Sequence, residues 1–230
     1  SNQDGRIHIN EALERGCSAV IWEREGWSWD STIKVPNIGF KNVRALMGEF
    51  SALFFGNPTS DMHVLGVTGT NGKTTCVNWL AEAFYLLGHD SACIGTLGVN
   101  IPGTALNNRY DETRTTPDAI ALQRVFRDLR DSGVSHVSIE ASSHALTQNR
   151  LDGTEIDIAI FTNLSHDHLD YHGTLEHYGI AKARLFLFGT LSKTIINIDD
   201  DFGADLAASL KRQDQHVVTY STVNEHADIF

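Results

Sequence analysis

The segment 64–75, VLGVTGTNGKTT, carries the residue types in this sequence that are best suited to chemistry. Its apolar start predicts a strand, and the glycine-rich turn 69–72 leads into the start of a helix. Backbone N–H groups at such a turn, together with the positive end of the helix dipole, form a site for the phosphates of a nucleotide. In that arrangement Lys73 would reach the β- and γ-phosphates, and the hydroxyl of Thr74 would hold Mg²⁺.

This turn departs from the strict phosphate-loop pattern. The pattern needs glycine six residues before the lysine, where this sequence has Val67. The strand before the turn and the amphipathic run after it supply the context that the motif needs, so we interpret the turn as a variant phosphate loop. A glycine-rich turn without a ligand is the alternative. The residues expected to hold the phosphates of the nucleotide are Gly69, Thr70, Asn71, Gly72, Lys73, Thr74 and Thr75.

A carboxylate ends another predicted strand. Glu140 follows the apolar-alternating residues 136–139, and a carboxylate at a strand end beside a phosphate loop is placed to bind Mg²⁺ directly or through water. A solvated glutamate is the alternative. Because the residues before Glu140 indicate a buried strand, we favour the metal role.

Residues 163–173, NLSHDHLDYHG, crowd histidines and aspartates into one loop. A solvated polar loop is one interpretation. A zinc hydrolase site is a second, because His166, His168 and Asp170 have the HxHxD spacing of metallo-β-lactamase-like enzymes. That signature continues with histidine where this chain has Tyr171, and it does not accompany a phosphate loop. The third interpretation is a ligand set for Mg²⁺ on the nucleotide, with a single histidine as ligand.

Two further positions remain ambiguous from their neighbours alone. The spacing around Lys182 fits an ordinary surface lysine on a helix. Thr115 and Thr116 precede Pro117 at the predicted start of another helix, where hydroxyls and free N–H groups suit an anion. Simple capping of that helix by Thr116 explains the pattern equally well.

Strand and helix patterns alternate along the chain, which predicts an α/β fold with a mostly parallel sheet flanked by helices. Ligands in such folds lie at the carboxyl ends of the strands. We therefore expect the polar clusters 69–75, 140–144 and 163–172 to meet at one edge of the sheet. The predicted strands are 19–22, 33–38, 64–67, 91–94, 134–140, 156–164, 194–198 and 217–220. The predicted helices are 9–15, 43–55, 117–132, 175–188 and 201–210, with one more after the phosphate loop and a polar loop at 100–116.

The composition is that of an ordinary globular protein, with 41% hydrophobic and 20% charged residues among 230. We expect no membrane span, because no apolar run approaches about 20 residues, and no signal peptide. A net charge of −11 argues against nucleic-acid binding, so an anionic small molecule must be held by a few placed cations. Three scattered cysteines indicate buried thiols in a reducing compartment, so we expect a cytoplasmic protein. Separately, we expect a monomer.

Taken together, the motifs resemble those of the Mur ligase family, and within it the members that add the third residue of the peptidoglycan stem peptide. The resemblance covers nearly the whole chain, and the family's phosphate loop reads TGTNGKT, which accounts for Val67. The matching segments are GVTGTNGKTT (66–75), TRTTPDA (113–119), IEASSHALTQNRL (139–151), FTNLSHDHLDYHGTLEHY (161–178), AKARLF (181–186) and INIDDD (196–201).

The resemblance implies an ATP-dependent ligase. Such an enzyme forms an amide bond between UDP-N-acetylmuramoyl-L-alanyl-D-glutamate and a diamino acid, meso-diaminopimelate or L-lysine, through an acyl phosphate. The implied catalytic residues are Lys73, Glu140, His168 and Lys182, with Lys182 carbamylated. The implied Mg²⁺ ligands are Thr74, Glu140, His168 and the carbamylated Lys182. The implied contacts to the muramoyl dipeptide are Thr115, Thr116, Ser142 and Arg150. Another Mur-type ligase, resembling folylpolyglutamate or cyanophycin synthetase, and a non-catalytic nucleotide-binding module are the alternatives.

The resemblance also implies a domain division. Residues 1–60 would be part of an N-terminal domain that binds the UDP substrate, and 61–230 a central ATP-binding domain that is incomplete at its C-terminus. The domain that selects the amino acid would be absent, so we expect this chain alone to be inactive. One departure from the family pattern is His166, where an arginine is expected.

Overall fold

The computed structural model describes residues 4–104 and 114–230. It divides into two compact units, Ser1–Met47 and Gly48–Phe230. The division falls inside helix α2 (Val43–Phe54), earlier than the boundary predicted at residue 60. The reason is that the second half of α2 packs within the larger unit, where Gly48 approaches the backbone of Asp152 so closely that a Cβ would overlap its carbonyl group.

The smaller unit is a short α/β piece. A 3₁₀ turn η1 (Gly5–His8) leads into α1 (Ile9–Glu14), and strands β1 (Val20–Glu23) and β2 (Asn37–Phe40) pair in parallel. The second strand was expected at 33–38. It begins at Asn37, after a turn in which the Asp30 carboxylate accepts bonds from both the amide and the hydroxyl of Thr32.

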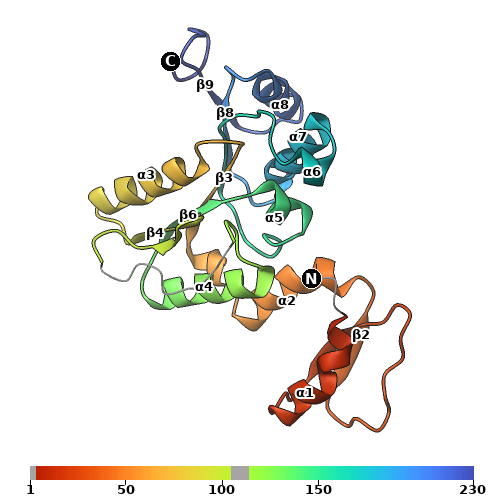
Figure 1. The fold of residues 1–230 in the computed structure, drawn as a ribbon. Helices are drawn as coiled ribbons and strands as arrows, with labels where there is room; N and C mark the ends of the chain where they lie inside the picture. Colours follow the sequence, from red (N-terminus) through yellow and green to blue (C-terminus); the bar gives the residue numbers. More distant parts are fainter. Residues whose placement is uncertain (1–3, 105–113) are drawn as a thin grey trace. The chain divides into compact units, whose positions relative to one another are not determined.

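The larger unit contains a seven-stranded sheet in the order β5-β4-β6-β3-β7-β8-β9 (Figure 1). All neighbouring strands are parallel except β5, which is antiparallel to β4. The predicted mostly parallel sheet is therefore confirmed. The strands are β3 (His63–Thr68), β4 (Ser91–Gly95), β5 (Gly98–Asn100), β6 (His136–Glu140), β7 (Ile158–Phe161), β8 (Lys193–Asn197) and β9 (Val217–Tyr220).

Helices connect these strands, and most lie where the sequence predicts them. The helical elements of the larger unit are η2 (Pro58–Asp61), α3 (Lys73–Leu86), α4 (Ala119–Asp131), α5 (Ser143–Thr147), α6 (Leu169–His172), α7 (Leu175–Ala183), η3 (Arg184–Leu187) and α8 (Asp201–Lys211). Among the described residues, no helix is both long enough and apolar enough to cross a membrane.

Three local predictions need correction. Helix α4 begins at Ala119, and its N-cap is Asp118 rather than Thr116, because the Asp118 carboxylate accepts bonds from the amides of Ile120 and Ala121. The predicted helix 175–188 changes to a 3₁₀ turn at Arg184. Strand β5 was not predicted and overlaps the loop predicted at 100–116 at Asn100 alone, and residues 105–113 of that loop lie outside the described residues.

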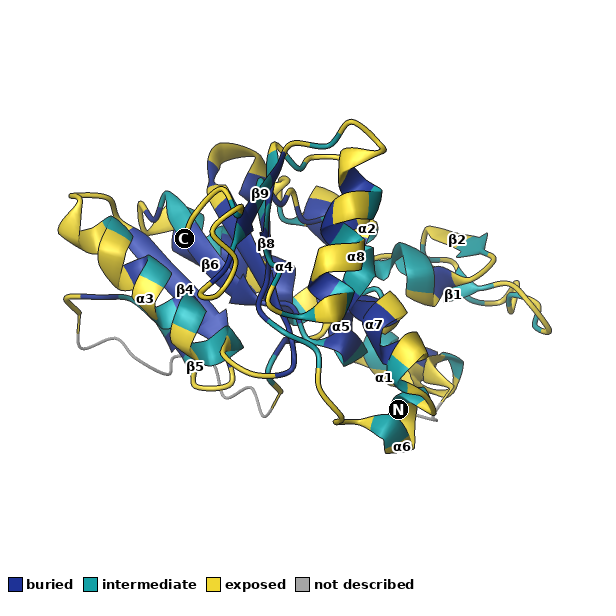
Figure 2. Ribbon diagram, turned by 90° about the horizontal axis from the view of Figure 1, so that it is seen from above, coloured by how far each residue is buried: buried dark blue, intermediate teal, exposed yellow. Residues whose placement is uncertain are grey.

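Successive side chains along a strand point to opposite faces of the sheet, so the apolar residues of the strands form two cores, one on each face. On one face Val64, Ile139 and Phe161 pack with Phe126 of α4 and Leu210 of α8. On the other face the core is smaller and is covered by α3; its members are Val67, Val77, Ala81, Cys93 and Ile160. The strands are accordingly buried between helices whose outer faces are exposed (Figure 2). This three-layer packing holds the strand ends rigidly.

The strand order places a topological switch point at β3. From β3 the chain goes out to β4, adds β5 at the edge and returns to β6, which lies between β4 and β3; it then crosses to the other side of β3 and adds β7, β8 and β9 in turn. The connections that leave the carboxyl ends of the neighbouring strands β3 and β7 therefore run in opposite directions, which leaves a crevice there for a ligand.

The core predicts a matched pair of stability effects in α4. Phe126 is fully buried, so Phe126→Ala should lower the free energy of unfolding by about 3–5 kcal/mol through lost contacts and a cavity. Ile120 on the same helix is 49% exposed, and Ile120→Ala should cost under about 1 kcal/mol. Urea unfolding followed by circular dichroism measures both; equal losses would contradict the assigned core.

Candidate functional site

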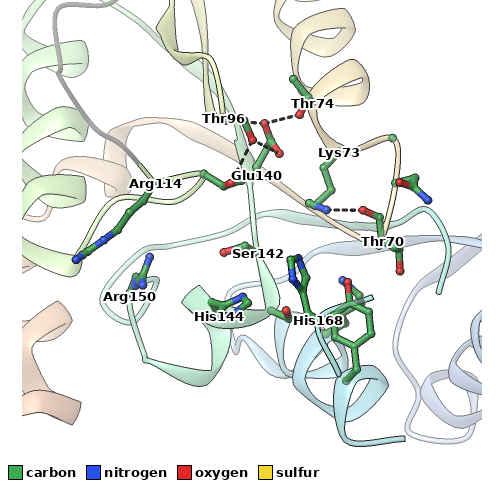
Figure 3. A pocket seen from close by; sticks show the side chains of 16 residues that line it. Thr70, Lys73, Thr74, Thr96, Arg114, Glu140, Ser142, His144, Arg150 and His168 are labelled. Atoms are coloured by element: carbon green, nitrogen blue, oxygen red, sulfur yellow. Dashed lines mark hydrogen bonds between the residues drawn. The ribbon is translucent and has the colours of Figure 1, made fainter. Parts of the chain in front are cut away.

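A cavity of about 480 Å³ lies at the carboxyl edge of the sheet, at the switch point (Figure 3). Its walls come from the phosphate loop, the end of β6 with α5, and the segment after β7, so the three predicted polar clusters meet. Its lining residues are Thr70, Asn71, Gly72, Lys73, Thr74, Thr96, Arg114, Thr115, Glu140, Ser142, Ser143, His144, Arg150, His168, Tyr178 and Lys182.

The phosphate loop turns sharply between β3 and α3. Gly72 has a φ of 84° and stands at the N-cap of α3, a left-handed conformation that glycine adopts without strain. The first N–H groups of a helix have no partner within the helix, so the start of α3 presents donors and a positive dipole end to the cavity. Lys73 is the first residue of this helix.

Two lysine amines converge on one backbone carbonyl. The Nζ of Lys73 donates to the carbonyl oxygens of Gly69 (2.7 Å) and Thr70 (2.8 Å). The Nζ of Lys182 donates to the same Gly69 oxygen at 2.7 Å. Burial lowers the pKa of Lys73, against the opposing attraction of Glu140 and Asp167. These two cations are therefore held together inside the protein and close to the phosphate loop.

Lys182 is buried, contrary to the surface position that its spacing alone suggests. Its exposed fraction is 1%, and its Nζ lies 4.1 Å from the ring centre of Tyr178, one helical turn earlier on α7. Burial, with Lys73 adding to it, lowers the pKa of Lys182 to about 7. Near neutral pH a large fraction of this amine is therefore uncharged and nucleophilic.

Glu140 ends β6 with its carboxylate directed at the first turn of α3. Its Oε1 accepts bonds from the hydroxyl of Thr74 (2.9 Å) and the amide of Thr96 (2.8 Å). Gly95, at the end of the neighbouring strand β4, makes room for it, because a Cβ there would overlap Oε1. Glu140 is 1% exposed, so this is a buried, positioned acid and not a solvated strand end.

His168 comes from the segment after β7. Its φ of 52° is left-handed, and its ring lies 5.0 Å from that of His144 and 6.0 Å from that of Tyr178. His168 lines the cavity, whereas His166 is exposed and is not among the lining residues. Within the described residues no group of three or more His, Cys, Asp or Glu is arranged to hold a metal ion, so the geometry lends nothing to the zinc hydrolase alternative.

The four residues expected to contact the dipeptide fall into two groups. Thr115, Ser142 and Arg150 line the cavity. Thr116 is fully buried beneath the wall, where its hydroxyl donates to the Glu140 carbonyl (2.6 Å) and lies 3.0 Å from the Ser142 hydroxyl. Its position supports the turn after β6. Thr75 and Gly69 of the phosphate loop are also absent from the lining, although the Gly69 carbonyl receives both lysines.

Sequence reasoning missed several lining residues. Thr96 follows β4, and the rule that ligands lie at strand ends would have indicated it. Tyr178 lies four residues before Lys182 on α7, a spacing that places both on one helix face. Arg114 and His144 lie within the matching segments 113–119 and 139–151, but no local pattern shows that their side chains face the cavity. Burial lowers the pKa of His144, so its imidazole is disposed to be neutral.

The comparisons with known proteins agree with this geometry. Residues 67–230 match the family model of the Mur ligase middle domain, and the chain belongs to the Mur ligase family. It is 44% identical over 94% of its length to the UDP-N-acetylmuramoyl-L-alanyl-D-glutamate–2,6-diaminopimelate ligase of Chromobacterium violaceum, and 41% identical over 94% to that of Nitrosomonas europaea. It covers 43% and 41% of those two relatives, which is less than half of each.

A solved structure of a ligase with the same description is similar over nearly the whole chain. The TM-score is 0.81 at 37% sequence identity, and the match covers 97% of this chain and 44% of that one. The fold expected from the resemblance is therefore confirmed.

The lowered pKa of Lys182 predicts how stability depends on pH. The unfolded chain keeps this proton up to the ordinary pKa of 10.5, whereas the folded chain loses it near 7, so the unfolded state binds more protons between these values. Raising the pH from 7 to 10 should therefore increase the stability of the wild type relative to Lys182→Met. Urea unfolding at several pH values measures this difference. Lys193→Met controls for the loss of a lysine. If the difference in unfolding free energy between the wild type and Lys182→Met stays constant from pH 7 to 10, the lowered pKa of Lys182 is contradicted.

Proposed function

We propose that this chain is the ATP-binding part of a ligase that joins UDP-N-acetylmuramoyl-L-alanyl-D-glutamate to a diamino acid in peptidoglycan precursor synthesis. The observation that carries the proposal is that Lys73, Glu140, His168 and Lys182 line one cavity at the switch point of the sheet. We take the diamino acid to be 2,6-diaminopimelate, because the relatives are named for it. Residues 1–60 would belong to a domain for the UDP substrate, and the cytoplasm, where such precursors are made, is the proposed location.

The nucleotide would lie over the start of α3. The N–H groups of the first turn and the Lys73 amine are the donors for its phosphates. Lys73 now donates to the Gly69 and Thr70 carbonyls, and it would exchange these partners for phosphate oxygens. The attraction between the Lys73 ammonium and the phosphate oxygens would be strong, because water weakens the interaction between charges less in a buried site.

Oxygen atoms near Glu140 fit a magnesium ion. The Thr74 hydroxyl and the Glu140 carboxylate are 2.9 Å apart, which is about the separation of adjacent ligands in an octahedron with bonds of about 2.1 Å. Bound Mg²⁺ would neutralise charge on the transferring phosphoryl group. His168 and Lys182 are the ligands proposed for a second ion, on the opposite wall.

The uncharged amine of Lys182 is suited to carbamylation. Its nitrogen would attack the carbon of CO₂, a proton would leave the nitrogen, and a carbamate with two oxygens would remain. This change replaces a cation by an anion, which suits Mg²⁺ because that ion prefers oxygen ligands. A pKa of about 7 makes the uncharged amine available, since an ordinary lysine would be almost wholly protonated at neutral pH.

The chemistry of the ligase then needs alignment more than acid–base groups. The dipeptide carboxylate would take the γ-phosphoryl group of ATP, and the amine of the diamino acid would displace phosphate from the acyl phosphate. Thr115, Ser142 and Arg150 line the same cavity, and Figure 3 shows Arg150 on the side away from Thr70 and Lys73, so these three residues are the proposed contacts to the dipeptide. The guanidinium of Arg150 already spans Gln148 and the Thr116 carbonyl, which fixes its orientation.

Nucleotide binding is testable on this chain. Titration calorimetry with Mg-ATP should detect binding, and Lys73→Ala should weaken it about 10- to 100-fold, because a hydrogen bond to a charged group contributes about 1.5–3 kcal/mol. Lys193→Ala, at the start of β8, is the matched control and should keep the wild-type affinity. Equal affinities of wild type and Lys73→Ala would refute the phosphate site.

The ligase activity requires the regions that the relatives have beyond this chain. A chimera in which this chain replaces the matching part of the Chromobacterium violaceum relative should release phosphate from ATP only when both the dipeptide and the diamino acid are present. Phosphate release when one of the two substrates is missing, or no phosphate release by a folded chimera, counts against the ligase.

The substitution Lys182→Ala in the chimera should abolish activity, and added short carboxylic acids should restore part of it. Full activity without rescue would exclude the carbamate.

A further inference from the structure

The phosphate loop is held from one side by the segment that follows β7. The amide of Thr70 donates to the backbone carbonyl of Asn163 (2.8 Å), and the amide of Asn71 donates to the side-chain Oδ1 of Asn163 (2.9 Å). The hydroxyl of Thr162 donates to the Asn71 carbonyl (2.7 Å), and the Nδ2 of Asn163 reaches the same oxygen at 3.3 Å. Three consecutive peptide groups of the loop, from Gly69 to Gly72, are therefore bonded to Thr162 and Asn163.

Close packing also joins the phosphate loop to the segment after β7. Gly69 lies against Thr162 so closely that a Cβ at position 69 would overlap the Thr162 hydroxyl. The loop and the end of β7 thus touch at backbone distance. This explains a glycine at position 69 without appeal to a ligand, since any side chain would separate the two segments.

We propose that Thr162 and Asn163 are positioning residues that form a latch on the phosphate loop. The latch fixes the first half of the loop before nucleotide arrives, and it uses the N–H groups of Thr70 and Asn71 for this purpose. The phosphates are consequently left to the N–H groups from Gly72 onward and to Lys73. Only the identity of the ligand rests on the proposed function; the latch itself is a property of the nucleotide-free chain.

The latch is anchored to the next strand. The Nδ2 of Asn197, at the end of β8, donates to the Thr162 carbonyl (2.8 Å), and the Asp200 carboxylate accepts the amide of Leu164 (2.6 Å). The residues that follow the latch also bond to the phosphate loop, because the amide of Ser165 donates to the Thr70 hydroxyl (2.9 Å). The segment that carries His168 and the phosphate loop are therefore joined, so a displacement of one is transmitted to the other.

The first test uses amide hydrogen exchange in the nucleotide-free chain. In Asn163→Ala the Asn71 amide loses its side-chain acceptor, whereas the Thr70 amide keeps the backbone carbonyl of residue 163. We expect exchange at Asn71 to become about fivefold faster or more, with exchange at Thr70 changing less than about twofold. Unchanged exchange at Asn71, or an equal increase at both amides, would overturn the latch.

The second test compares Thr162→Ser with Thr162→Ala, which differ only in the hydroxyl. Calorimetric titration with Mg-ADP should show Thr162→Ser within about threefold of wild type and Thr162→Ala weaker by about tenfold. Thr194→Ala, a buried threonine at the amino end of β8, controls for the loss of a strand threonine and should bind as the wild type does. Equal affinities of Thr162→Ser and Thr162→Ala would overturn the latch.

The two tests separate the latch from the proposed function. If the wild type fails to bind Mg-ADP, the nucleotide site is refuted, and the exchange rates of Thr70 and Asn71 still decide whether the latch exists.

Discussion

The carboxyl ends of β6, β3 and β7 come to one edge of the sheet, and this geometric constraint determines which strands contact the phosphate loop. β3 must deliver the phosphate loop between two neighbouring parallel strands, so the loop touches both. Glu140 reaches it from β6, and Thr162 reaches it from β7. The close approach of Gly69 to Thr162 is the tightest of these contacts, and it leaves little freedom to the turn that follows.

Burial at that edge sets the electrostatics of the site. The chain carries a net charge of −11, yet Lys73, Lys182, Arg114 and Arg150 all line one cavity. Two of these cations share the Gly69 carbonyl and are shielded from water, which lowers the pKa of both amines. The same burial that makes a charged Lys182 costly makes its uncharged amine available for carbamylation. Placed cations, and not the overall charge, therefore define what this site can bind.

Sequence reasoning recovered the parallel sheet and the three polar clusters because both depend on short-range patterns. A continuous apolar run located β3, apolar alternation located β6, and the ends of these strands located Lys73 and Glu140. The misplaced start of α4 shows the weakness of the same approach, because Thr116 and Asp118 are both good capping residues and only the fold selects between them. Short elements such as α5 and α6 were missed because four or five residues show too little periodicity.

The sequence by itself determined the phosphate loop, the order of strands and helices along the chain, and the resemblance of six separated motifs to the Mur ligase family. Those features are written in residue types and spacing within a single segment. Tertiary structure alone decided that Lys182 is buried against Gly69 and that Thr116 supports the turn after β6 from beneath the cavity. It also decided that Asn163 bonds to three peptide groups of the loop. Each of these depends on segments far apart in the chain meeting at one sheet edge, and burial and partners at such a meeting leave no local signal.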